Sequence, residues 1–196
     1  VPMDMFSREI ETDCFERTYM DSHETKKPGL DPEAAKAIAK ELIEAKNPVI
    51  HAGGGVLLAP ASKELQDLVE FLDIPVSRTL MGQSCIPDSH PLMLGQTGFW
   101  GFELTHKKTT TADRILILGS RMAEADSSSW YKGVTFNQSV TKFMQIDIDP
   151  QEIGRNYPVM IGAQADIKLA LQQILAAAKE LKPEGIDHPE LRKEIA

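Results

Sequence analysis

The sequence predicts an α/β fold in which a parallel sheet of about six strands is covered by helices on both faces. Short apolar runs of strand length alternate with segments in which apolar residues recur at helical spacing. Glycine, proline and asparagine mark the junctions between them. This alternation is typical of parallel strands joined by helical crossovers. With 196 residues, of which 42% are hydrophobic, the chain is long enough for one domain with a substantial core.

The first half of the chain supplies two predicted helices and two predicted strands. Asp31 followed by Pro32 indicates a helix start, and apolar residues then keep a helical period to about residue 45. Residues 49–52 form a short apolar strand that leads into three glycines. The pattern repeats as a helix over residues 61–72 and a strand over residues 74–79.

The second half begins with a loop rich in glycine, proline and serine, which is predicted to extend to about residue 98. A polar helix over residues 101–111 follows it. The remaining elements are three apolar strands and a strongly amphipathic helix, over residues 115–118, 143–148, 159–161 and 165–181. Together these segments predict a Rossmann-like sheet of the type that binds NAD or FAD.

The two ends of the chain are predicted to be linkers. Residues 1–30 are mixed and polar, and their first four resemble the tail of a strand from a preceding domain. The helical pattern weakens after Pro183, so residues 183–196 are expected to lead to a following domain. We therefore expect an excised central domain over residues 31–182.

Composition excludes several classes of function. The net charge of −8 gives no electrostatic footprint for nucleic acid or for an anionic membrane surface. The sequence contains neither an apolar run of bilayer length nor a signal-peptide pattern. Cys14 and Cys85 are far apart and are interpreted as reduced thiols of a cytoplasmic protein. The five histidines lack metal-ligand spacing and are interpreted as structural or solvated, so no metal site is predicted.

Candidate ligand-binding residues follow the predicted strands, because parallel sheets bind ligands beyond their carboxyl ends. Gly53, Gly54 and Gly55 either bring the backbone close to a phosphate or form a tight turn. The segment from Thr79 to Gly82 either holds a ribityl chain or phosphate or is a plain loop. Leu58 stands where the third glycine of an NAD fingerprint belongs, which argues against a simple NAD site.

Three charged residues at later strand ends have similar double interpretations. Arg121 either pairs with a phosphate or forms a surface salt bridge. Asp147 is placed to accept hydrogen bonds from ribose hydroxyls or an adenine amine, whereas Asp166 is interpreted first as a helix cap. Phe99 and Trp100 are interpreted as a buried aromatic pair, with a lid or an interface anchor as the alternatives.

In combination these segments resemble the central domain of thiamine-diphosphate-dependent enzymes of the acetolactate-synthase type. The resemblance covers about residues 30–180 and is most specific at Ile146–Pro150 with Glu152–Asn156. It is also carried by Asn47–Ile50, Gly53–Gly55, Ile74–Val76, Thr79–Gly82, His90–Leu92, Gly95, Ala112–Asp113, Leu118–Arg121 and Ala165–Leu171.

The resemblance implies a three-domain parent in which the other two domains bind thiamine diphosphate and magnesium at a dimer interface. It also implies that the central domain holds FAD, ADP or nothing. The implied cofactor-binding residues are Gly54, Gly55, Thr79, Leu80, Met81, Gly95, Gly119, Arg121, Asp147, Ile148 and Asp166. Two departures weaken the case for FAD: the second arginine expected after Arg121 is missing, and Gly95 is followed by Gln96-Thr97-Gly98 instead of a histidine motif.

We expect no catalytic residue in this chain, because the Gly-Asp-Gly…Asn motif for metal and diphosphate is absent. The implied parent is a homo-oligomeric transferase or lyase that decarboxylates or ligates 2-oxo acids. The alternative is a structural domain with a vestigial nucleotide site that mediates oligomerisation. A free-standing NAD-linked enzyme is disfavoured, because the sequence shows no catalytic His/Asp pair and no acid for the ribose.

Overall fold

Six parallel strands form the centre of the protein, as the sequence predicts. The computed structural model describes residues 3–9 and 26–195. The strand order is β3-β2-β1-β4-β5-β6, and every neighbouring pair is parallel. Strand order reverses between β1 and β4, the position at which open α/β sheets bind ligands. The strands are β1 Pro48–Ala52, β2 Val76–Arg78, β3 Met93–Gln96, β4 Arg114–Leu118, β5 Lys142–Asp147 and β6 Val159–Gln164.

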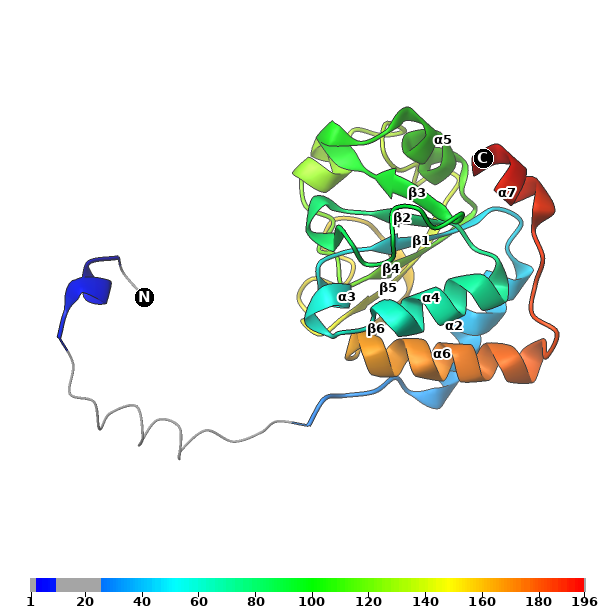
Figure 1. Ribbon diagram of the computed structural model, residues 1–196, viewed down its shortest axis with the longest axis horizontal. Coiled ribbons are helices and arrows are strands. Elements are labelled where there is room, and N and C mark those ends of the chain that lie inside the picture. The colour runs from blue at the N-terminus through cyan, green and yellow to red at the C-terminus, as the bar shows by residue number, and fades with distance from the viewer. Residues whose placement is uncertain (1–2, 10–25, 196) are drawn as a thin grey trace.

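Helices cover the sheet on both faces (Figure 1). The α-helices are α2 Pro32–Glu44, α3 Gly55–Leu58, α4 Ser62–Leu72, α5 Glu103–Thr111, α6 Ile167–Leu181 and α7 Pro189–Ile195. The 3-10 helices are η1 Met3–Ser7, η2 Leu80–Gly82, η3 Gly98–Trp100 and η4 Ala125–Trp130. Helices α2, α4 and α6 lie together below the sheet in Figure 1, and α5 lies on the other side.

The core has two parts because successive side chains of a strand point to opposite faces of the sheet. Leu116 and Leu118 of β4 pack into the larger cluster with α2, α4 and α6. Ile115 and Ile117 of the same strand pack on the other face, against aromatic residues that include Phe136. Both faces of β4 are therefore buried, which explains its uninterrupted apolar sequence.

Local capping explains where the two main helices begin. Asp31 accepts a hydrogen bond from the amide of Ala34 at 3.2 Å, and Pro32 occupies the first helical turn of α2. Asp166 accepts from the amides of Lys168 and Leu169 at 3.1 and 3.2 Å at the start of α6. The interpretation of Asp166 as a helix cap is thus confirmed.

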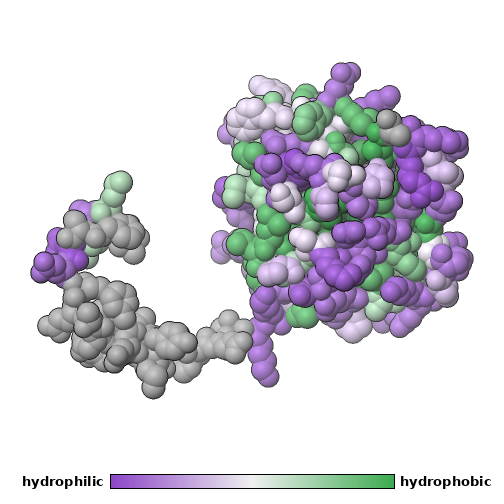
Figure 2. Space-filling model, viewed as in Figure 1, coloured by the Kyte–Doolittle hydropathy of each residue, from purple (hydrophilic) through white to green (hydrophobic). Residues whose placement is uncertain are grey.

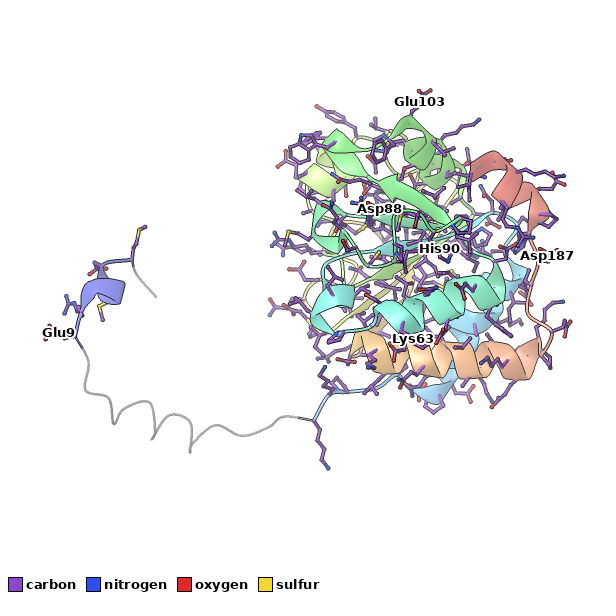
Figure 3. The ribbon with its side chains drawn as sticks, viewed as in Figure 1. Glu9, Lys63, Asp88, His90, Glu103 and Asp187 are labelled. Atoms are coloured by element: carbon purple, nitrogen blue, oxygen red, sulfur yellow. The ribbon has the colours of Figure 1, made fainter. Side chains whose placement is uncertain are left out.

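Strand β3 lies inside the segment that the sequence predicts to be a loop, and that prediction is wrong for residues 93–96. The strand has only four residues, too few for an alternating pattern to stand out, and one of them is Gly95, whose φ of +101° is unusual for a strand. It pairs with β2 at the edge of the sheet with a shift in register. An ion pair between Arg78 and Asp88 and a hydrogen bond between His90 and Glu70, both at 3.2 Å, hold the preceding loop. Asp88 and His90 are labelled in Figure 3.

The C-terminal segment contains a helix, α7, within the residues expected to be a linker. Leu191 of this helix is buried, and Arg192 pairs with the buried Asp73 at 3.0 Å. Lys108 of α5 also pairs with Glu194. Residues 189–195 are therefore packed on the domain, while the division into a central domain and two linkers stays a prediction.

Candidate functional site

A cavity of about 610 Å³ opens at the carboxyl edge of the sheet, beside the reversal of strand order. Its walls come from the turns after β1, β2, β4 and β5, from the start of α6, and from the segment before α2. Its volume falls within the range of small-molecule sites, about 300–1,000 Å³. It is lined by Lys26, Lys27, Pro28, Gly54, Gly55, Leu58, Ala59, Thr79, Met81, Gly119, Ser120, Arg121, Asp126, Asp147, Ile148, Glu152, Asp166 and Ile167.

Nine of the eleven predicted cofactor-binding residues lie in this lining. They are Gly54, Gly55, Thr79, Met81, Gly119, Arg121, Asp147, Ile148 and Asp166. The other two lie outside it. Leu80 is exposed on η2, and its amide donates to Asp126 at 3.3 Å. Gly95 lies in β3, where an added Cβ would meet the ring of Phe102 at 2.5 Å.

Several lining residues were not predicted. Lys26, Lys27 and Pro28 fall within residues 1–30, which the sequence predicts only as a linker, although they form one wall of the cavity. Asp126 lies in the 3-10 helix η4 and Glu152 in the turn after β5, segments without periodicity, so only the fold brings them to the cavity. Pairs of lysines beside a proline are too common to indicate a ligand site in the absence of the fold.

The three-glycine turn is explained first by packing of backbone against backbone. An added Cβ at Gly53 would lie 2.3 Å from the carbonyl oxygen of Gly119, and one at Gly55 would lie 2.6 Å from the Gly119 Cα. The turns after β1 and β4 can approach this closely only because no side chain intervenes. The tight-turn interpretation therefore accounts for Gly53 and Gly55, although Gly55 also lines the cavity.

The amides of these turns are largely engaged within the protein. Gly53 donates to the carbonyl of Leu118 at 2.8 Å, Gly55 to that of Gly119 at 3.0 Å, and Gly119 to that of Ile146 at 2.9 Å. The side chain of Thr79 also accepts from the amide of Gly82 at 3.0 Å. These four amides are therefore not available to an anion in the cavity.

Arg121 and Asp126 form a charged pair of neighbours on the β4 side of the cavity. Arg121 is exposed and lines the cavity, and its guanidinium forms no ion pair with the residues that the structure describes. Burial raises the pKa of Asp126, although the Leu80 amide and the charge of Arg121 act in the opposite direction. This arrangement leaves Arg121 next to a carboxyl that loses its proton less readily than usual.

Two carboxylates, one at the end of β5 and one in the turn that follows, provide hydrogen-bond acceptors. Burial raises the pKa of Asp147, whose side chain accepts from the amide of Asp149 at 3.0 Å. One oxygen of Glu152 pairs with Arg155 at 2.9 Å. The other, Oε2, is buried and has no hydrogen-bond partner in the described part of the chain. A hydroxyl or amine of a ligand would satisfy this orphaned oxygen.

Asp166 has three partners at the start of α6. Besides the two capped amides, it pairs with Lys27 at 2.9 Å, and its own side chain is almost fully buried. Burial alone would raise its pKa, but the hydrogen bond from Lys27 and the capped amides bring the pKa below its usual value. Asp166 is therefore held ionised by the protein itself.

The cavity also has apolar walls suited to a ring system. Leu58, Met81 and Ile148 line it and are strongly exposed, at 87%, 73% and 53% of their surface. Figure 2 shows apolar surface at the edge of the domain where Figure 1 places α3. The cations, the carboxylate acceptors and the apolar walls together fit a ligand that carries phosphates, hydroxyls and a ring.

Other residues singled out in the sequence have simpler roles. Phe99 and Trp100 are 56% and 64% exposed, so their interpretation as a buried pair is wrong. His51 is buried against Ser77, and His90 pairs with Glu70, whereas His23 and Cys14 lie outside the described residues.

Within residues 3–9 and 26–195 no cluster of three or more His, Cys, Asp or Glu could hold a metal ion. No helix in those same ranges has the length and apolarity to cross a membrane.

The fold and the cavity define an α/β domain of the Rossmann-like class with a cavity at its topological switch point. The family model described as thiamine pyrophosphate enzyme, central domain, matches residues 35–174. The chain therefore belongs to the family of central domains of thiamine pyrophosphate enzymes, as the resemblance in its sequence indicates.

Curated relatives agree with this assignment. The chain is 38% identical over 163 residues to a probable acetolactate synthase large subunit of Methanocaldococcus jannaschii, covering 79% of this chain and 27% of the relative. It is 34% identical over 186 residues to glyoxylate carboligase of Escherichia coli O157:H7, covering 94% and 30%. It is 33% identical over 201 residues to sulfoacetaldehyde acetyltransferase of Roseovarius nubinhibens, covering 100% and 31%. The chain spans less than a third of the length of these relatives.

Proposed function

We propose that this domain binds FAD or ADP in the cavity at the carboxyl edge of the sheet. The observation that carries the proposal is the convergence of nine predicted residues on one cavity at the reversal of strand order. Arg121 would contact the diphosphate, and Asp147 and Glu152 would accept hydrogen bonds from the ribose or the adenine. The apolar side chains of Leu58 and Ile148 would pack against a ring.

We further propose that the parent protein is a thiamine-diphosphate-dependent enzyme of the acetolactate-synthase type. Relatives named acetolactate synthase, glyoxylate carboligase and sulfoacetaldehyde acetyltransferase support a transferase or lyase that acts on a 2-oxo acid or a related aldehyde. Thiamine diphosphate and magnesium would be held by the pyrimidine- and diphosphate-binding domains, in a cytoplasmic homo-oligomer. The cofactor would supply the carbanion chemistry, and this domain would position those domains without catalysing a step.

Calorimetry with the 196-residue chain tests the nucleotide proposal. We expect micromolar binding of ADP or FAD, and a loss of roughly 10- to 100-fold in affinity for Arg121→Ala, since a charge-assisted contact contributes about 1.5–3 kcal/mol. Arg8→Ala, at an exposed arginine outside the cavity lining, is the matched control and should bind as the native chain does. Absence of heat with both ligands would contradict the proposal.

The exposed aromatic side chains favour a second candidate, a spacer domain that mediates oligomerisation. Phe99 and Trp100 on η3 and Phe102 beside them are more than half exposed, and η3 contacts η4, which ends at the partly exposed Trp130. Apolar groups gathered in this way commonly mark protein interfaces. If this function holds, the native chain should associate in sedimentation velocity, and Phe99→Ser/Trp100→Ser should be monomeric. A native chain that is monomeric at high concentration would argue against it.

A further inference from the structure

The segment Lys26–Leu30, here called the strap, runs across the start of α6 and forms one wall of the cavity. The Pro28 carbonyl accepts from the amide of Asp166 at 2.8 Å. The amide and carbonyl of Leu30 form two hydrogen bonds with the side chain of Gln173, at 2.7 and 3.0 Å, and the Leu30 side chain is buried. The strap is therefore fixed to the domain by its backbone and does not depend on its lysines alone.

The strap carries most of the positive charge of the cavity. Among the described residues that line it, the cations are Lys26, Lys27 and Arg121, and four carboxylates oppose them. Without the two lysines, Arg121 alone would face those carboxylates, and the cavity would repel a diphosphate. A phosphate-bearing ligand thus needs the strap more than it needs any other wall.

Three backbone amides of the adjoining turns cannot replace these lysines, because they already have partners. Gly53, Gly55 and Gly119 of the adjoining turns donate to carbonyls of the protein. Lys27 now pairs with Asp166, yet its side chain is 58% exposed, and Lys26 is exposed as well. Because an ammonium has three N–H donors, Lys27 can contact a ligand while it stays paired with Asp166, and the exposed Lys26 can reach one as well.

We propose that Lys26 and Lys27 are ligand-binding residues that contact the phosphates, so that ligand binding and docking of the strap reinforce each other. This inference rests on the proposed nucleotide function. A ligand that binds only the docked strap must stabilise that docking by the same free energy with which docking favours the ligand. Occupancy of the cavity would then restrain the segment that precedes the domain.

The first test is calorimetry with ADP on Lys26→Ala/Lys27→Ala. We expect affinity to fall roughly tenfold and its dependence on salt to become weaker, because two charge-assisted contacts are lost. Lys36→Ala/Lys40→Ala removes the same charge from exposed positions on α2 and should change affinity less than about twofold. Lys26→Arg/Lys27→Arg keeps the positive charge and should bind ADP with native affinity. If the lysines served only in folding, keeping the charge would not by itself be expected to preserve the affinity.

The second test is limited trypsin digestion of the native chain. The Lys27–Pro28 bond resists trypsin, so cleavage in the strap falls at Lys26–Lys27 and requires local opening. Saturating ADP should slow this cleavage several-fold. If ADP binds but neither the alanine variant nor the digestion responds, the strap inference is overturned while the nucleotide function stands. If neither ADP nor FAD binds the native chain, the nucleotide function fails and the strap inference fails with it.

Discussion

At the scale of single residues, the structure separates two reasons for which a position requires glycine. Gly53 has an ordinary φ, and the carbonyl of Gly119 occupies the space that its Cβ would need. Gly133 has a φ of +75° with open space around it. The first residue is glycine because of contact, and the second because of backbone conformation.

These two cases predict different effects of alanine. Gly53→Ala should lower the free energy of unfolding by about 2–4 kcal/mol, because backbone must move to relieve a 2.3 Å overlap. Gly133→Ala should lower it by only about 1–2 kcal/mol, the strain of a left-handed residue. Urea denaturation of both variants measures the difference. Equal effects would mean that the turns after β1 and β4 can separate freely.

At the scale of elements, residues buried in a regular pattern could be predicted from the sequence, and residues placed by long-range contacts could not. Helix α6 shows its buried face in its own periodicity, and β4 is an uninterrupted apolar run. Strand β3 has neither signal, because it is a four-residue edge strand whose pairing with β2 defines it. Helix α7 is similar, since its hold on the domain comes through Asp73 and Lys108, far away in sequence.

The candidate site follows the same division. Strand ends are visible in the sequence, so Gly119, Arg121 and Asp147 could be predicted to share one edge of the sheet. The remaining walls come from irregular segments. Glu152 reaches the cavity because the buried Gln145 holds its loop, donating to the Glu152 carbonyl at 3.0 Å and accepting from the Gly154 amide at 2.8 Å. No local pattern could have predicted that three-way contact.

At the scale of the whole molecule, one buried histidine makes the fold sensitive to acid. His51 lies in the central strand β1, fully buried, with Nδ1 3.0 Å from the Ser77 hydroxyl and its ring edge-on to Phe136. Its Nε2 is buried with no hydrogen-bond partner within the described ranges. Burial lowers the pKa of His51 from 6.5 to about 3, so the folded protein holds this ring neutral.

We expect this histidine to lower the free energy of unfolding as the pH falls below 6.5. In that range His51 binds a proton in the unfolded chain but stays neutral in the folded chain. Above pH 6.5 the effect vanishes. Between pH 6.5 and 4.5 it should lower the free energy of unfolding by roughly 2–3 kcal/mol. Urea denaturation across this range, compared with His51→Gln, isolates the effect. Asp126 and Asp147 have raised pKa values and oppose the trend, but they are present in both proteins and cancel in the difference. Parallel pH profiles for the two chains would contradict this prediction. They would mean that water reaches the His51 ring in the folded protein, so that burial does not lower its pKa.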